Sequence, residues 1–353
     1  MLAAIGHRRP DRVPVTVPMA TEVARRLAGH LGTDAAGLAR WLDDDLVCVH
    51  PAHRRPIDEP SYADPTVAVS PEGHFLDIWG VPFRQVTAGE QTYVELAGRP
   101  PLAGVESVAD LDEHPWPSAD DWDYAVVPAR LAAAGDRAVR AHSRGFFEIA
   151  HFMRGMDAFL TDMALRPELA GGLMDRIAAY LLERSRRTLT AGGGRFDILE
   201  YNDDVASQRG LFISPAMWRE QIRPRMKPFC DLAHEFGTAL RYHCCGSPRE
   251  IIGDLIDVGV DILNPVQPLA AGMDPFELKR AFGDRLTFDG GIDIQQLLPH
   301  ATPEEVRRHV RRMVDVVGAG GGYILGPSHS IQADVPDENI VAMIDAARRQ
   351  NGK

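Results

Sequence analysis

The chain has 353 residues, of which 45% are hydrophobic and 25% are charged. This length and balance are typical of a globular protein with a large core and exclude a mostly disordered chain. The 38 basic and 50 acidic residues give a net charge of −12. Because nucleic acids and anionic lipid surfaces bind through a cationic field, we expect neither as a partner. An anionic small substrate remains compatible with this charge, since local arginines can override the overall sign.

The four cysteines, Cys48, Cys230, Cys244 and Cys245, are too few for a disulfide framework in a chain of this length. Two of them are adjacent in sequence, and vicinal cysteines rarely form a structural bridge. The beginning of the chain lacks the long apolar stretch of a signal peptide, and no run approaches the roughly 20 apolar residues of a membrane helix. We therefore expect a reducing, cytoplasmic location.

The first third of the chain has an irregular pattern. Residues 20–42 have the periodicity of a helix. Residues 73–86 are typical of a hairpin or loop excursion, which carries Phe75, Trp79 and Phe83, and residues 100–122 of a connector with a short helix. We therefore expect residues 1–135 to carry N-terminal insertions.

From about residue 138 onward, short apolar runs alternate with amphipathic stretches of helical length. Together with two earlier runs they give eight candidate strands, at residues 13–17, 46–49, 138–142, 196–201, 239–243, 262–265, 286–288 and 323–325. Alternating strands and helices with short connections predict a parallel sheet, and eight such units close into an α/β fold of the (β/α)8 TIM barrel type. We predict a single domain over residues 1–353, with the regular barrel units in residues 136–353.

Three helix starts support this register. Thr302, Asp274 and Ser247 are each followed by proline at the first helical position and by glutamate at the third. The capping side chain satisfies free backbone N–H groups, and proline has no N–H to lose there. We therefore expect Ser247 to cap the helix that follows the strand at 239–243.

Active sites of such barrels form at the C-terminal ends of the strands. His243 ends the strand at 239–243 and Cys245 follows two residues later, so both side chains can turn towards one point above the barrel. An imidazole nitrogen and a thiolate are ligands that suit Zn²⁺. The alternative is a buried histidine beside two packing cysteines, since both residue types occur in cores. The strand-end position favours a metal site, with Cys244 turned aside to pack.

A second polar group follows the strand at 196–201. Glu200, Asp203, Asp204 and Gln208 would be costly to desolvate at a barrel mouth without a partner. A cation, a cationic intermediate or a proton transfer would supply one, so we predict the three acidic residues as catalytic and Gln208 as substrate-binding. A solvated acidic turn is the alternative.

His329 follows the last candidate strand. Because every strand end of a closed barrel faces the same cavity, His329 can approach His243 and Cys245 despite the distance in sequence. Three protein ligands and an open fourth position are typical of catalytic zinc. Taken alone, an ordinary loop histidine is the alternative. Three further residues are predicted to line the substrate site, with a structural role as the alternative: Arg154, His142 and Trp79.

Several motifs resemble the uroporphyrinogen decarboxylase superfamily and occur in the same order. They are the opening at 6–15, the stretch at 75–80, Arg154-Gly155, the tripeptide at 213–215, the run at 243–246 and the segment at 336–340. The match extends over nearly the whole chain. The resemblance implies a (β/α)8 barrel that is often dimeric, so we expect a homodimer.

The superfamily has two main chemistries. True uroporphyrinogen decarboxylases use no cofactor and grip substrate carboxylates with an Arg-Gln-Ala-Gly-Arg-Tyr motif, which this chain lacks. Corrinoid-linked methyltransferases bind zinc through a His-x-Cys pair and a distant Cys. His243 and Cys245 match the pair, whereas His329 occupies the position of the distant Cys. Decarboxylase members also place a histidine near that position, so His329 alone does not select the branch.

The resemblance therefore implies a zinc-dependent methyltransferase that moves a methyl group between a corrinoid protein, or a small methylated substrate, and an acceptor. Asp203, Asp204 and Gln208, with residues 332–336, resemble members linked to O-demethylation or tetrahydrofolate methylation. Zn²⁺ is the expected cofactor, with a cobalamin-bound partner or methylcobalamin as co-substrate. A cofactor-free decarboxylase and a non-catalytic binding barrel are the two alternatives.

Overall fold

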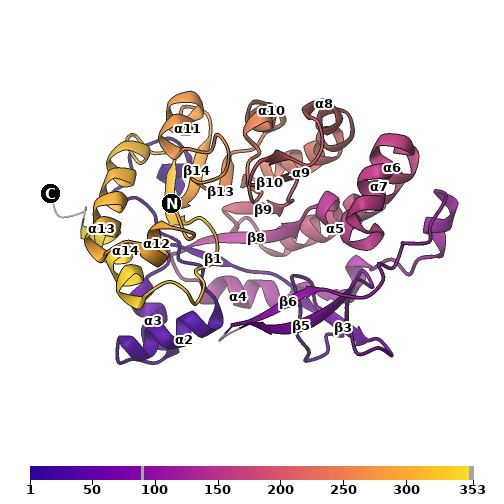
Figure 1. The fold of residues 1–353 in the computed structure, drawn as a ribbon, viewed down its shortest axis with the longest axis horizontal. Helices are drawn as coiled ribbons and strands as arrows, with labels where there is room; N and C mark the ends of the chain where they lie inside the picture. The colour runs from indigo at the N-terminus through magenta and orange to yellow at the C-terminus, as the bar shows by residue number, and fades with distance from the viewer. Residues whose placement is uncertain (89–90, 350–353) are drawn as a thin grey trace.

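The computed structural model describes residues 1–88 and 91–349. At its centre is a curled sheet in which every pair of neighbouring strands is parallel. Figure 1 shows this sheet surrounded by helices. In spatial order its strands are β1 (Leu46–Cys48), β8 (Ala138–Arg144), β9 (Ile198–Asn202), β12 (Ala239–His243), β13 (Ile262–Val266), β14 (Thr287–Ile292) and β15 (Tyr323–Pro327).

The segment at residues 13–17 lies between the two edge strands. Val15 forms a parallel bridge with Leu325 of β15, and the N–H of Asp45, directly before β1, donates to the Val15 carbonyl at 3.1 Å. The prediction of a regular strand here is wrong, because Pro14 and Pro18 have no N–H to donate to a ladder. The predicted α/β barrel is confirmed, with seven regular strands and this irregular segment in the eighth position.

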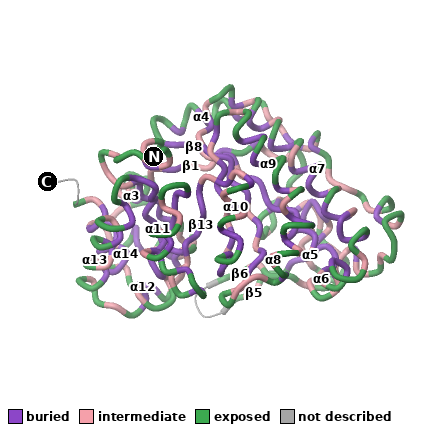
Figure 2. Tube along the Cα trace, turned by 90° about the horizontal axis from the view of Figure 1, so that it is seen from above, coloured by how far each residue is buried: buried purple, intermediate pink, exposed green. Residues whose placement is uncertain are grey.

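Helices cover the outside of the sheet. Figure 2 shows exposed residues along the outer helices and buried residues in the strands at the centre. Within the described residues, no helix combines the length and apolar character needed to cross a membrane. The helices are α1 (Leu2–Ile5), α2 (Thr21–His30), α3 (Ala35–Leu42), α4 (Val127–Ala133), α5 (Phe146–Arg154), α6 (Met156–Leu165), α7 (Pro167–Ala191), α8 (Pro215–Met217), α9 (Arg223–Glu235), α10 (Ile252–Val258), α11 (Pro275–Phe282), α12 (Leu297–His300), α13 (Pro303–Arg312) and α14 (Asp337–Arg349).

The N-terminal third forms the elements that its pattern predicts. The helices α2 and α3 occupy the helical stretch at 20–42, and short 3-10 helices lie in the connector at 100–122. The predicted hairpin belongs to a four-stranded antiparallel sheet, which lies beside the barrel in Figure 1. The additional strands are β2 (Ala52–His53), β3 (Thr66–Val69), β4 (Phe75–Asp77), β5 (Pro82–Ala88), β6 (Gln91–Leu96), β7 (Trp122–Asp123), β10 (Ala206–Ser207) and β11 (Gly210–Leu211).

The inner face of the barrel is arranged in layers. Successive side chains of a strand point to opposite faces, so residues two apart lie on the same face. The N-terminal ends of the strands contribute an apolar layer, to which the first residues of the chain add two side chains: Leu46, Ala138, Ile198, Ile262, Ile324, Met1 and Ile5. Two residues further along, the inner face carries charged side chains instead: Arg140, Glu200, Arg241 and Asp289. The barrel is therefore apolar at one end and polar towards the C-terminal ends of its strands.

Two of the three predicted helix starts are confirmed. Thr302 forms a capping box with Glu305 at the start of α13, and Asp274 accepts from two backbone N–H groups at the start of α11. The prediction for Ser247 is wrong. The turn that follows has Pro248 at its N-cap position and no side-chain cap, and the Ser247 hydroxyl donates instead to the carbonyl of Ala271 at 2.5 Å.

All four cysteines are free thiols. Cys244 is fully buried, whereas Cys245 is partly accessible. The prediction that this adjacent pair forms no disulfide is therefore confirmed, and Cys244 packs into the core as expected.

Candidate metal centre

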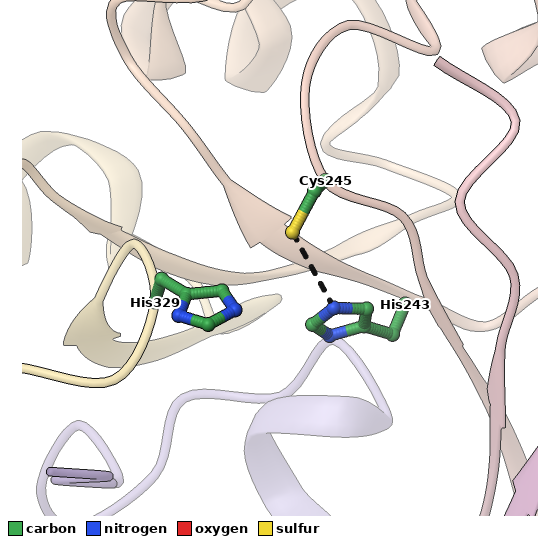
Figure 3. Close-up of side chains that lie close together, drawn as sticks. All are labelled: His243, Cys245 and His329. Carbon is green, nitrogen blue, oxygen red and sulfur yellow. Dashed lines mark hydrogen bonds between the residues drawn. The ribbon is translucent and has the colours of Figure 1, made fainter. Parts of the chain in front are cut away.

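Three side chains that can ligate a metal meet at the C-terminal ends of two strands. His243 is the last residue of β12, Cys245 follows in the next loop, and His329 follows β15. One ligand atom from each lies within 4.8 Å of the others. Figure 3 shows the Cys245 sulfur turned towards the His243 ring, with the His329 ring beside them. The tertiary structure thus brings together the three residues that the sequence predicts as ligands.

A hydrogen bond holds the His243 ring in one tautomer. Its Nδ1 lies 2.7 Å from Oδ1 of Asn264, so the Nδ1–H donates to this oxygen and Nε2 keeps its lone pair. Burial and the positive charge of Arg241 lower the pKa of His243 to about 3. The ring is therefore neutral near pH 7 and presents a ligating nitrogen to the cluster.

The spacing of one pair of donor atoms suits zinc. A tetrahedral Zn²⁺ with Zn–N of about 2.05 Å and Zn–S of about 2.3 Å separates its nitrogen and sulfur ligands by about 3.6 Å. Nε2 of His243 and Sγ of Cys245 are 3.6 Å apart. His329 is exposed at the mouth, so the cluster can be reached from solvent. Two imidazoles and one thiolate fit a catalytic zinc site with an open position.

Hydrogen bonds hold the loops that carry the cluster. The N–H of Cys245 donates to Oδ1 of Asp204 at 2.7 Å. Oε1 of Gln267 accepts from the N–H of Gly246 at 2.9 Å, and its amide nitrogen donates to the carbonyl of Ser328 at 3.4 Å. Gln267, which follows β13, therefore connects the loop of the thiol with the loop of the second histidine.

The surroundings of the Cys245 thiol favour its protonated form. Burial and the negative charge of Asp204 raise the pKa of Cys245. Burial also raises the pKa of Asp204. A bound cation would offset these effects, because the thiolate is the form that ligates a metal.

A cavity of about 200 Å³ lies inside the barrel, lined by both histidines of the cluster and by the charged layer. Within that layer Glu200 contacts both Arg140 and Arg241, and Asp289 accepts from Nε of Arg241 at 2.7 Å. Pairing of opposite charges offsets part of the cost of burying them. A small molecule in the cavity would lie between the metal ligands and this paired floor.

The acidic residues predicted as catalytic lie in three different environments. Glu200 is buried in the ion pairs of the floor. Asp203, directly after β9, lies on the same side of the sheet as Tyr201 and opposite to Glu200, because strand side chains alternate. It accepts from the N–H of Glu148 at 2.8 Å and from the Tyr201 hydroxyl at 2.7 Å, and burial raises its pKa to about 7. Asp203 therefore caps α5 and does not line the cavity, whereas Asp204 contacts the cluster.

One of the residues predicted to bind substrate lies at the cluster. Gln208 donates to Oε1 of Gln267 at 2.5 Å. His142 is on the inner face of β8 and lines a second cavity. Trp79 and Arg154 are buried, and each donates to a buried carboxylate. These two residues hold the N-terminal part of the fold together and do not line the cavity beneath the cluster.

Sequence reasoning found Glu200 and Asp204 but missed the other residues of the charged floor, Arg140, Arg241 and Asp289, and two residues that support the cluster, Asn264 and Gln267. For Arg140 and Arg241 a signal exists, because each lies two residues before a predicted site histidine on the same strand. For Asn264 and Gln267 we find no local signal. Their roles depend on β13 lying next to β12, which the tertiary structure decides.

Comparison with known proteins identifies the family. Residues 108–350 match the model of the family described as uroporphyrinogen decarboxylase (URO-D). The chain belongs to this family. The superfamily resemblance predicted from the sequence motifs is therefore confirmed.

Curated relatives share parts of the chain. The uroporphyrinogen decarboxylase of Psychromonas ingrahamii is 33% identical over 193 residues, which cover 51% of this chain and 48% of that protein. That of Serratia proteamaculans is 32% identical over 80 residues, 23% of this chain and 22% of the relative. The chain thus matches about half, or less, of the length of these relatives.

A solved structure matches almost the whole fold. A methyltransferase from Methanosarcina mazei has a TM-score of 0.64 and 18% sequence identity, and the match covers 99% of this chain and 97% of the other. At this identity the likeness concerns the fold, which it extends to the N-terminal elements outside the family match.

Proposed function

We propose that this chain is a zinc-dependent methyltransferase, which moves a methyl group between a corrinoid protein or small methylated substrate and an acceptor. The observation that carries the proposal is the cluster of His243, Cys245 and His329, whose ligand atoms lie within 4.8 Å of one another. The methyltransferase from Methanosarcina mazei, similar over nearly its whole length, adds support. A corrinoid protein as partner and a homodimer belong to the same proposal.

The chain's own residues would hold and tune the metal. His243, Cys245 and His329 would ligate it, and Asn264 would keep Nε2 of His243 free for it. Asp204 orients the loop of the thiol through the Cys245 N–H. Bound zinc supplies Lewis acidity, and a set with two neutral imidazoles leaves it more positive than one with two thiolates. This donor set suits polarising an ether oxygen better than holding a very nucleophilic thiolate.

A cofactor-free decarboxylase is the second candidate, because the curated relatives carry that name. In such an enzyme free cationic groups would bind substrate carboxylates. In this cavity Arg140 and Arg241 are already paired with Glu200 and Asp289. The pairing favours the methyltransferase, although Arg140 keeps part of its side chain exposed.

Metal analysis of protein purified without an affinity tag tests the proposal. We expect about one zinc per chain, lost in Cys245→Ala because a catalytic site needs its ligands. Cys244→Ala is the matched control, since Cys244 is buried in the core and should retain zinc when replaced. Methyl transfer from methylcobalamin should be retained in the wild type and in Cys244→Ala and lost in Cys245→Ala. A folded wild-type protein that binds no zinc would overturn the proposal.

A further inference from the structure

A second cavity, of about 420 Å³, lies between the segment at residues 48–66 and the end of β8. Its volume falls within the range of about 300–1,000 Å³ that is typical of small-molecule pockets. Most of its wall is apolar and comes from that segment and from the connector before α4: Pro51, Pro56, Ile57, Pro65 and Trp122.

Buried contacts hold the outer wall in place. Asp64 accepts from Nε1 of Trp79 at 2.8 Å and from Arg144 at 3.0 Å, and lies 3.6 Å from Arg184. Further along the wall, Ala52 pairs with Asp123 in the β2–β7 ladder. Protein interiors are close-packed and keep few voids larger than a water molecule. A cavity with anchored walls is therefore preformed and is not a gap that the segment closes by collapsing.

One polar side chain on the inner wall has no protein partner. His142 lies on the inner face of β8, and no residue in the described part of the chain bonds its ring nitrogens. Burial and the positive charge of Arg140 lower the pKa of His142 well below its usual value. A neutral imidazole offers one donor and one acceptor. A partly buried polar ring without a partner costs free energy that a hydrogen-bonding ligand recovers.

The charged groups of the walls leave little free charge for a ligand. Arg184 and Asp64 face each other, and Asp64 is also bonded by Arg144. The one further carboxylate among the lining residues, Glu59, is exposed at the rim and disfavours anions. A charged ligand would have to compete with these pairs, whereas an uncharged ligand would not.

We propose that this cavity is a binding site for a small, uncharged and largely apolar molecule with one polar group that hydrogen-bonds to His142. This cavity and the one beneath the metal-ligand cluster share no lining residue, although they adjoin at β8, where Arg140 lines one and His142 the other. The proposal does not depend on zinc, because none of the three metal ligands lines this cavity.

Three probes with the same ring test the site: phenol, toluene and benzoate, titrated into the full chain by calorimetry and by NMR of the histidine rings. We expect phenol to bind and to shift the His142 signals. Toluene should bind about fivefold more weakly, the size of one neutral hydrogen bond. Benzoate should bind more weakly than either. Benzoate binding more tightly than phenol would overturn the proposal of an uncharged ligand.

Substitutions separate the cavity from non-specific binding. His142→Phe should weaken phenol about fivefold and leave toluene unchanged, whereas His300→Phe, on the exposed surface elsewhere, should change neither. Ala63→Trp should fill the cavity and abolish the binding of both probes, and Ala132→Trp, exposed on α4, should not. Equal phenol binding in Ala63→Trp and wild type would contradict the proposal. Thermal melts of all variants show which are folded. The binding of phenol and toluene should be the same with and without bound zinc.

Discussion

Two polar clusters near the mouth of the barrel differ in how their polar atoms are satisfied. In the metal-ligand cluster, Nε2 of His243 and Sγ of Cys245 face each other at 3.6 Å, and His329 is exposed beside them. The second cluster, called the ion-pair cluster below, consists of Asp64, Trp79, Arg144, Glu148 and Arg184. In it, Asp64 is bonded by both Trp79 and Arg144. The first cluster leaves donor atoms for a ligand, whereas the second uses almost all of its charges within the protein.

Because of this difference, we expect the two clusters to affect different properties, metal binding in one case and folding stability in the other. A saturated network in a low dielectric specifies one arrangement of the chain, and removing a member leaves a buried charge without its partner. Donor atoms that face one another have little effect on folding until a ligand binds. Substitutions in the ion-pair cluster should therefore change stability, and substitutions around the metal-ligand cluster should change metal affinity.

The largest effect is expected from Arg144→Met. Arg144 bonds Asp64 and Glu148 at 3.0 Å each and is 2% exposed, so its loss leaves Glu148 without its ion-pair partner and Asp64 with Arg184 as its one remaining cation. We expect the free energy of unfolding in urea to fall by about 3–5 kcal/mol. The control is Arg84→Met, which breaks the exposed pair with Glu95 and should cost less than about 1 kcal/mol. A loss in Arg144→Met as small as in the control would contradict the assigned role.

The next effect is a pH dependence from Asp77. Burial and the negative charge of Asp64 raise the pKa of Asp77 to about 7, above its value in the unfolded chain. Its contribution to stability is therefore complete below about pH 4 and is lost as the pH rises through about 7. Asp77→Asn keeps the oxygen that accepts from the N–H groups of Trp79 and Val81 at 2.9 Å.

We therefore expect Asp77→Asn to gain stability relative to wild type between pH 4 and pH 8, by about 4 kcal/mol at most. Urea unfolding at several pH values measures this difference. Parallel curves for the two proteins would show that Asp77 does not titrate in this range.

Metal affinity is expected to depend on Asn264. Asn264→Leu removes the acceptor of the His243 Nδ1–H, so the ring can rotate or change tautomer. We expect zinc affinity to fall about 10- to 100-fold, as for other residues that orient a metal ligand. Asn202→Leu is the matched control, since Asn202 lines the same cavity but does not bond His243. Competition with a zinc chelator measures both, and equal affinities would remove Asn264 from the site.

The smallest effect is expected from Gln267→Leu. This change removes the link between the Gly246 N–H and the Ser328 carbonyl, while all three ligands remain. Zinc affinity should fall less than about tenfold, and the visible spectrum of the Co²⁺-loaded protein should change. Gln267→Glu keeps the acceptor oxygen and should restore much of the affinity. If the Co²⁺ spectrum is unchanged in Gln267→Leu, the link has no role in shaping the cluster.

Most strands and the three candidate ligands could be predicted from the sequence. Alternation of apolar runs and helices identifies the strands, and in a closed barrel all strand ends face one cavity. His243, Cys245 and His329 each follow or end a predicted strand, so their meeting needed only the barrel. These features depend on local pattern and on chain order.

Other features depend on strand pairing and on direction, which only the tertiary structure decided. Asp203 was grouped with the catalytic acids, but its place directly after β9 turns it towards α5. Asn264 reaches His243 because β13 pairs with β12 in a register that sets these two residues side by side. Such contacts join residues far apart in sequence, so no local periodicity encodes them. The sequence by itself determined the barrel and the three candidate metal ligands, and the tertiary structure decided which side chains support them.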